Sequence, residues 1–149
     1  MSLKTVFDHH PHLGRTLRDT YGGSLIPEQI LYDGLRDRPL VYVAAYYSHN
    51  PAHGMSEAMH AWADLVDLGY LPYVPHLSFF LDAVQPHSSE FWYEYDLGIL
   101  KRCDLLYVCD DDLTKVSHGV SVEIAYAREH GIPVFYGLED LYIWELAKR

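Results

Sequence analysis

The chain has 149 residues and a formal net charge of −10, with 49% hydrophobic and 21% charged residues. These values predict one globular domain with its own core, and they exclude a chain that is disordered throughout. The acidic balance disfavours binding to a nucleic-acid polymer, although local donors can still bind a small anion. No apolar run reaches the roughly 18 residues of a membrane span, and the N-terminus lacks a signal-peptide core, so we expect a cytoplasmic protein without a membrane partner.

Residues 1–38 precede the first strong strand signal and are interpreted as an N-terminal extension to a domain at 39–149. The histidine cluster HHPH at 9–12 has no accompanying Cys or helical His pair, so we interpret it as a solvated arm and expect no metal or cofactor. Residues 26–35 predict a short helix, with Pro27 in its first turn. The extension is expected to pack on the domain or on a neighbouring subunit.

Residues 40–45 form a nearly continuous apolar run, LVYVAA, which is typical of a strand buried on both faces. The loop at 46–54 follows at the carboxyl end of this strand. The first βα loop of a parallel sheet is a common place for ligand contacts. The alternative is an aromatic loop that packs on its own sheet.

Apolar residues at helical spacing predict an amphipathic helix over 55–68 that ends at Gly69. We interpret Met55, Met59 and Trp62 as core residues of this helix. Residues 70–74 predict the second strand, and Pro72 indicates an edge position because proline cannot donate to a sheet ladder.

Residues 75–89 form a predicted loop that is long for a plain connection, which favours a functional role. Besides Phe79 and Phe80, it carries His76, Asp82, Gln85 and His87. The two phenylalanines either stack on a flat ligand or plug the core under the loop.

Ser88 or Ser89 is expected to cap the next helix. Its predicted buried stripe consists of Trp92, Tyr95, Ile99 and Leu100. Asp96 falls beside that stripe, where an unpaired buried charge would be costly. It is therefore either a functional carboxylate or an exposed residue on the flank of the helix.

Residues 105–109 predict a third buried strand, followed by an acidic turn at 110–112 that we interpret as a solvated loop. Cys103 and Cys109 lie too far apart along an extended run to form a disulfide and are expected to be reduced thiols. A fourth strand is predicted at 134–136 and a terminal helix at 138–147.

Residues 117–124 read SHGVSVEI and are expected to open a helix between the third and fourth strands. Ser117 and Gly119 are small, so backbone N–H groups at this helix N-terminus can approach an anion such as phosphate. Glu123 lies about one turn further along, where its carboxylate can act as a nucleophile or a base. The alternative is a helix cap with a glutamate in the first turn.

Three segments together resemble the nucleoside 2-deoxyribosyltransferase-like superfamily, over about residues 40–137. The 117–124 segment is similar to its Ser-x-Gly-x-x-x-Glu-[Ile/Leu] signature. Residues 41–49, VYVAAYYSH, resemble its first strand and substrate loop, and residues 92–104, WYEYDLGILKRCD, resemble its Asp-bearing helix. The resemblance implies an α/β fold: a Rossmann-like or flavodoxin-like three-layer sandwich with a parallel sheet of four to five strands.

The resemblance also implies an N-glycosidic site. Glu123 would be the nucleophile, positioned by Tyr47, and Asp96 would help to protonate the base or orient the sugar. The implied substrate-binding residues are Ser117, Gly119, Ser48, His49, Tyr46 and Phe79, with His53 as a further candidate. Some relatives carry Gly and Arg in this loop, whereas in this chain the loop at 46–54 has no Arg and its one Gly is the final residue, Gly54. The implied partners are a small nucleoside or nucleotide and further copies of the chain, as a homodimer or higher homo-oligomer.

Ser117 favours the 2′-deoxynucleoside 5′-phosphate N-hydrolase branch of this superfamily, because the transferases tend to carry an acidic residue at that position. The expected function is therefore cleavage of the base–sugar bond of a nucleoside 5′-monophosphate. Two alternatives stay open. One is a transferase that exchanges bases between nucleosides, and the other is a nucleotide-binding module without catalysis.

Overall fold

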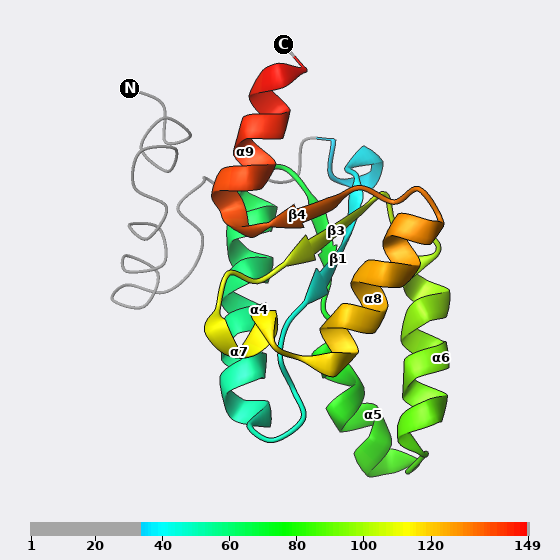
Figure 1. The fold of residues 1–149 in the computed structure, drawn as a ribbon. Helices are drawn as coiled ribbons and strands as arrows, with labels where there is room; N and C mark the ends of the chain where they lie inside the picture. The colour runs from blue at the N-terminus through cyan, green and yellow to red at the C-terminus, as the bar shows by residue number, and fades with distance from the viewer. Residues whose placement is uncertain (1–33, 149) are drawn as a thin grey trace.

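The structure is a computed structural model that describes residues 34–148. Its strands β1 (Leu40–Ala44), β2 (Leu71–Tyr73), β3 (Leu105–Val108) and β4 (Val134–Tyr136) form one parallel sheet in the order β2-β1-β3-β4 (Figure 1). This is the beginning of a doubly wound order, in which the chain reverses its direction across the sheet between β1 and β3. The predicted α/β fold with a parallel sheet is confirmed.

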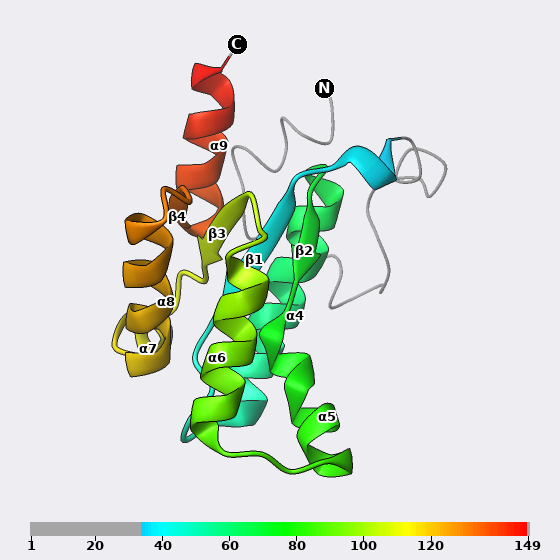
Figure 2. The same ribbon diagram turned by 90° about the vertical axis from the view of Figure 1, so that its right-hand side faces the viewer.

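Helices cover both faces of the sheet and make a three-layer sandwich (Figure 2). Helices α4 (Pro51–Asp67) and α9 (Gly137–Ala147) pack on the face that carries Val41 and Val43. Helices α6 (Ser89–Leu100) and α8 (His118–Glu129) pack on the face that carries Tyr42 and Ala44. Because neighbouring residues of a strand point to opposite faces, burial on both sides requires the continuous apolar run seen in the sequence.

Short helical segments occupy connections that the sequence analysis interpreted as loops. The prediction that 75–89 is a loop without helices is wrong, because this segment contains η2 (Pro75–Leu77) and α5 (Ser78–Val84) and reaches the start of α6. The acidic turn runs into a further short helix, α7 (Asp112–Lys115). A 3-10 turn, η1 (Leu35–Asp37), precedes β1. The predictions for the histidine cluster and for the helix up to residue 33 lie outside the described residues.

Helix α4 begins four residues earlier than predicted. The Asn50 side chain caps it by accepting a hydrogen bond from the His53 backbone N–H at 3.2 Å, and Pro51 occupies the first turn. Proline fits that position because its missing N–H would have no intrahelical partner there. The helix ends as expected before Gly69, whose φ of 97° lies in the left-handed region.

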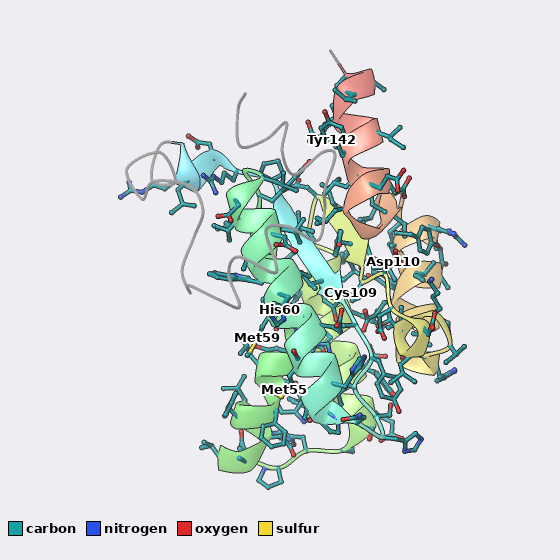
Figure 3. The ribbon with its side chains drawn as sticks, turned by 90° about the vertical axis from the view of Figure 1, so that its left-hand side faces the viewer. Met55, Met59, His60, Cys109, Asp110 and Tyr142 are labelled. Carbon is teal, nitrogen blue, oxygen red and sulfur yellow. The ribbon has the colours of Figure 1, made fainter. Side chains whose placement is uncertain are left out.

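The prediction that Met59 and Trp62 are core residues of α4 is wrong, although Ala58 and Leu65 of the same predicted apolar face are buried. Met59 and Trp62 are 49% and 46% exposed, whereas Ala58, Ala61 and Leu65 are buried against the sheet. Figure 3 looks onto the outer side of this helix and labels Met55 and Met59. Both sets of residues have helical spacing, and the small side chains let the helix backbone approach the sheet closely.

The predicted buried stripe of α6 is also only partly correct. Leu100 is fully buried, whereas Tyr95 is 44% exposed.

The edge position of the second strand is confirmed, because Pro72 lies on β2 and β2 is an edge strand. Cys103 and Cys109 are both buried and are not joined in a disulfide, which confirms the prediction. In the segment 34–148, no helix is both long enough and apolar enough to cross a membrane.

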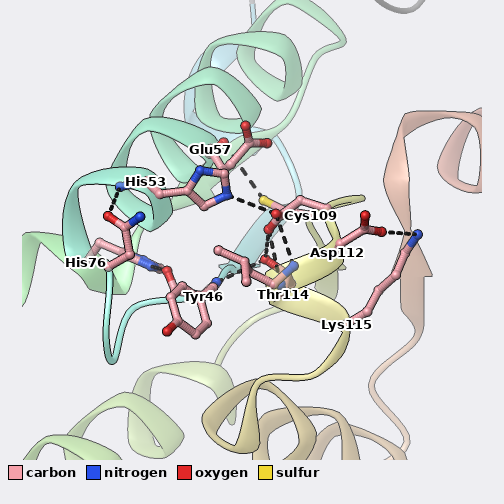
Figure 4. Close-up of polar contacts among 11 residues, drawn as sticks. Tyr46, His53, Glu57, His76, Cys109, Asp112, Thr114 and Lys115 are labelled. Carbon is pink, nitrogen blue, oxygen red and sulfur yellow. Dashed lines mark hydrogen bonds and ion pairs between the residues drawn. The ribbon is translucent and has the colours of Figure 1, made fainter.

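A hydrogen-bond network ties the loop after β1 to the loop after β3 (Figure 4). The Tyr46 backbone N–H donates to the Thr114 hydroxyl at 3.0 Å, and this hydroxyl donates to Asp111. Asp111 also accepts from the backbone N–H groups that open α7 and contacts His53 Nε2 at 2.9 Å. Thr114 is buried, so the network holds the two loops together at the point where the strand order reverses.

Gly54 allows α4 to pass directly under the same loop. A Cβ atom at this position would lie 1.5 Å from the Tyr46 carbonyl oxygen. We therefore expect Gly54→Ala to lower the free energy of unfolding by about 1–3 kcal/mol, because the loop backbone must move. The measurement is chemical denaturation of the purified protein.

Gly98→Ala is the matched control for this substitution. Gly98 lies in α6, and a Cβ atom there meets no atom within 4 Å. Its replacement should stabilise the protein by roughly 0.5–1 kcal/mol through helix propensity. Equal effects of the two substitutions would contradict the close approach of α4 to the loop.

Candidate active site

A cavity of about 370 Å³ opens at the carboxyl ends of β1, β2 and β3. Ligands of open parallel sheets bind at this edge, where the strand order reverses. The cavity wall comes from the loops after these strands and from α5, α6 and α8. Its lining residues are Ala45, Tyr47, Ser48, Pro75, His76, Ser78, Phe79, Asp82, His87, Ser89, Trp92, Tyr93, Asp96, Ser117, Gly119, Val120 and Glu123.

Two carboxyl groups meet in this cavity, Glu123 from α8 and Asp96 from α6. Glu123 Oε2 and Asp96 Oδ1 are enclosed, and neither has a hydrogen-bond partner among residues 34–148. Burial raises the pKa of Glu123 to about 8, and the nearby charge of Asp96 adds to this rise. Burial also raises the pKa of Asp96 to about 7. Near neutral pH the pair therefore holds a proton that is available for transfer.

Glu123 is not the cap of its helix. The Ser117 side chain fills that role by accepting from the Val120 backbone N–H at 3.4 Å, and the first turn of α8 contains no acidic residue. The alternative interpretation of Glu123 as a first-turn glutamate in a cap is therefore wrong. No structural task of the helix N-terminus accounts for its position in the cavity wall.

Tyr42 lies beside this pair and was missed by the sequence reasoning. It is fully buried on β1, and within residues 34–148 its hydroxyl has no partner of regular hydrogen-bond geometry, although it lies close to the Glu123 carboxyl. Burial, followed by the charges of Glu123 and Asp96, raises the pKa of Tyr42. In return, the hydroxyl lowers the pKa of Glu123 and partly offsets the effect of burial. A hydroxyl within an otherwise apolar strand was the available signal.

The N-terminus of α8 reaches the cavity at Ser117 and Gly119, as predicted. A Cβ atom on Gly119 would meet Tyr93 at 3.7 Å, which is an ordinary contact. This glycine is therefore not required for space in the protein without ligand. A helix of twelve residues offers unpaired N–H groups and partial positive charge at this wall.

Of the predicted site residues in the loop after β1, two line the cavity and two do not. Tyr47 and Ser48 line it, and the Tyr47 ring packs edge-on against His76, with 5.6 Å between the ring centroids. Tyr46 and His49 do not line it; instead the Tyr46 hydroxyl accepts from the His49 backbone N–H at 3.0 Å. They shape the loop rather than the cavity wall.

His53 and His76 both have structural partners. His53 contacts Asp111 in the network described above and lies outside the cavity wall. His76 is buried at the wall, and its Nε2–H donates to the Tyr46 carbonyl at 3.0 Å. Burial lowers the pKa of His76, so the ring is neutral at pH 7.

The end of the cavity next to α5 is aromatic and includes Phe79, as predicted. It also contains Trp92, which the sequence analysis placed in the core, and Asp82 and His87, to which it gave no individual role. Helices α5 and α6 and the hydrogen bonds between them bring these residues to the cavity wall. Their spacing in the sequence does not indicate that they meet there. Within residues 34–148, no group of three or more His, Cys, Asp or Glu side chains is placed to hold a metal ion.

The two enclosed carboxyl groups should make stability depend on pH. Their pKa values in the folded protein lie above the ordinary 4.5 of Glu and 3.8 of Asp. The native state therefore keeps protons that the unfolded state loses, and the free energy of unfolding falls as pH rises from about 4 to about 8.

We expect Glu123→Gln to be more stable than the wild type at pH 8.5 by on the order of 3 kcal/mol, and to differ little from it at pH 4.5. Urea denaturation at both pH values measures this difference. Glu94→Gln, at an exposed position on α6, should stay within about 0.5 kcal/mol of the wild type at both. A pH-independent effect of Glu123→Gln would show that the carboxyl is not held protonated.

Comparison with known proteins identifies the family. Residues 39–137 match the family model described as "Domain of unknown function (DUF7768)". The chain matches no curated protein and no solved structure. The matched segment runs from the residue before β1 to the first residue of α9, so it contains the whole sheet and every residue that lines the cavity. The chain belongs to the DUF7768 family.

Proposed function

We propose that the protein is an N-glycosidase that cleaves the base–sugar bond of a nucleoside or deoxynucleoside 5′-monophosphate. The observation that supports this most is the pair of carboxyl groups, Glu123 and Asp96, in one cavity wall. In the described part of the chain, their enclosed oxygens have no hydrogen-bond partner. Burying carboxyl oxygens without hydrogen-bond partners lowers the stability of the free protein, and a bound ligand can supply the missing partners. Two carboxyl groups with different tasks are the usual equipment of glycoside hydrolysis.

The chemistry assigns one task to each carboxyl group. Cleavage of an N-glycosidic bond develops positive charge on the sugar and negative charge on the leaving base. The Glu123 carboxylate attacks the anomeric carbon and forms a glycosyl ester as the C–N bond breaks, while protonated Asp96 gives its proton to the base. Asp96, now ionised, then takes a proton from water, which attacks the anomeric carbon and releases Glu123.

Tyr42 favours the form of the pair that this sequence of steps needs. Its hydroxyl lowers the pKa of Glu123, which stabilises the ionised nucleophile. The positive charge that develops on the sugar acts in the same direction. One proton on Asp96 and none on Glu123 is the reactive state. Because the pKa of Glu123, about 8, lies above that of Asp96, about 7, the proton rests on Glu123 in the protein without ligand and must pass to Asp96 when the substrate binds.

The N-terminus of α8 supplies a place for the 5′-phosphate. Unpaired N–H groups and the helix dipole favour an anion next to Ser117 and Gly119. Ser48 lines the same cavity and offers a further hydroxyl. A phosphate bound there would leave the sugar between it and the aromatic end, next to the carboxyl pair.

The first test is the release of free base from deoxynucleoside monophosphates, followed by chromatography. Glu123→Gln should lower the rate by about 1,000-fold or more because the nucleophile is lost, while equilibrium binding of the nucleotide is kept. Glu94→Gln should keep the wild-type rate. Base exchange between free nucleosides, without action on monophosphates, would favour a transferase, and binding without any turnover would contradict an enzyme.

A second test concerns the phosphate. Asp is as good a helix cap as Ser, so Ser117→Asp should keep α8 intact while adding a negative charge at the phosphate position. We expect KM for a deoxynucleoside monophosphate to rise about 100-fold, with a much smaller change for the free nucleoside. Steady-state kinetics on the two substrates measures this ratio. Equal changes on both would show that the phosphate does not bind at α8.

A further inference from the structure

The end of the cavity that faces α5 holds a charged group for which the proposed reaction has no use. Asp82, at the end of α5, lines the cavity together with Phe79, Trp92 and His87. It belongs to none of the three segments that carry the superfamily resemblance. A carboxylate among aromatic rings in a ligand cavity requires its own explanation.

Two hydrogen bonds hold Asp82 in a fixed orientation. Its Oδ1 accepts from the Trp92 indole Nε1–H at 2.7 Å and from the His87 backbone N–H at 2.8 Å. These bonds close the turn between α5 and α6, and they lower the pKa of Asp82, so the group is ionised at pH 7. Both lone pairs of Oδ1 are occupied, whereas within residues 34–148 no hydrogen-bond donor to Oδ2 is found.

The position of Asp82 relative to the carboxyl pair follows from α6. Trp92 and Asp96 are four residues apart on this helix, and both line the cavity. Four residues of helix correspond to a rise of about 6 Å. Asp82 is held at the Trp92 ring, so it lies roughly one helical turn beyond Asp96, towards the turn between α5 and α6.

This placement leaves one part of a nucleotide to meet Asp82. In the proposed function, on which this inference rests, the anomeric carbon lies at Glu123 and the phosphate at Ser117. The base must then extend into the remaining end, between Phe79 and Trp92. Flat aromatic walls suit a base, and the carboxylate there has one oxygen ready to accept a hydrogen bond.

We propose that Asp82 is a specificity-determining residue, whose Oδ2 accepts a hydrogen bond from an exocyclic amino group of the base. The site then takes amino-bearing bases in preference to matched bases without that group. Any base that binds here displaces water from Oδ2. A base without a donor at this point leaves the carboxylate oxygen without a hydrogen bond, and this unfavourable free energy is the source of the discrimination.

The test compares matched pairs of deoxynucleoside monophosphates that differ in one amino group: guanine against hypoxanthine, adenine against purine, and cytosine against pyrimidin-2-one. Binding is measured by calorimetry on the Glu123→Gln protein, which does not turn the ligand over. We expect at least one pair to show a preference of 10-fold or more for the amino-bearing base.

Asp82→Asn is the decisive variant. The amide oxygen can keep both bonds to Trp92 and His87, while an NH₂ donor replaces Oδ2. We expect the preference to disappear or to reverse towards the base without the amino group. Asp112→Asn removes the same charge from a fully exposed position outside the cavity and should leave the preference unchanged.

Trp92→Phe provides a second variant, which keeps an aromatic ring but removes the indole N–H that orients Asp82. We expect it to reduce the preference without reversing it. The proposal is overturned if no pair shows a preference, or if Asp82→Asn leaves the preference intact.

The outcomes for the two proposals can be told apart. Base release by the wild-type protein without any effect of Asp82→Asn on base preference would reject the role of Asp82 alone. A preference that reverses in Asp82→Asn, without base release by the wild type, would reject the glycosidase and keep the role of Asp82. Failure of all six nucleotides to bind would reject both.

Discussion

The cavity is built around two carboxyl groups, Glu123 and Asp96. Each has a buried oxygen that finds no hydrogen-bond partner within residues 34–148. Glu123 and Asp96 come from helices on the same face of the sheet and meet where the strand order reverses. In an ordinary core, such groups would be replaced by apolar side chains, because desolvation of a carboxylate is expensive. The buried strands and the packed faces of α6 and α8 supply the stability that lets the pair persist.

The loop after β1 shows how the fold keeps this cavity open. Its backbone is held from one side by the Thr114 hydroxyl and from the other by His76, and it rests on α4 at Gly54. Each of these contacts uses a backbone atom of Tyr46. The position of Tyr47 and Ser48 in the cavity wall is therefore decided by main-chain hydrogen bonds and by the absence of a side chain at Gly54.

The cavity has two chemically different ends. One end holds the carboxyl pair and the N-terminus of α8, whose N–H groups favour an anion. The other is lined by aromatic rings and contains Asp82, fixed by Trp92 and His87. The nucleotide that we propose as the substrate has an anionic part for the first end and a flat part for the second.

The sequence by itself determined the parallel sheet, the edge position of Pro72 and the start of α8 after its cap, Ser117. Burial on both faces and helix capping leave patterns that can be read locally. It also indicated Glu123 and Asp96 as carboxylates worth explaining. Only the tertiary structure decided that Met59 and Trp62 face outward, since two sets of residues on α4 share the helical period. It alone brought Asp82 and Trp92 to the cavity and Tyr42 next to Glu123, because their contacts span separate elements and depend on packing that no local pattern encodes.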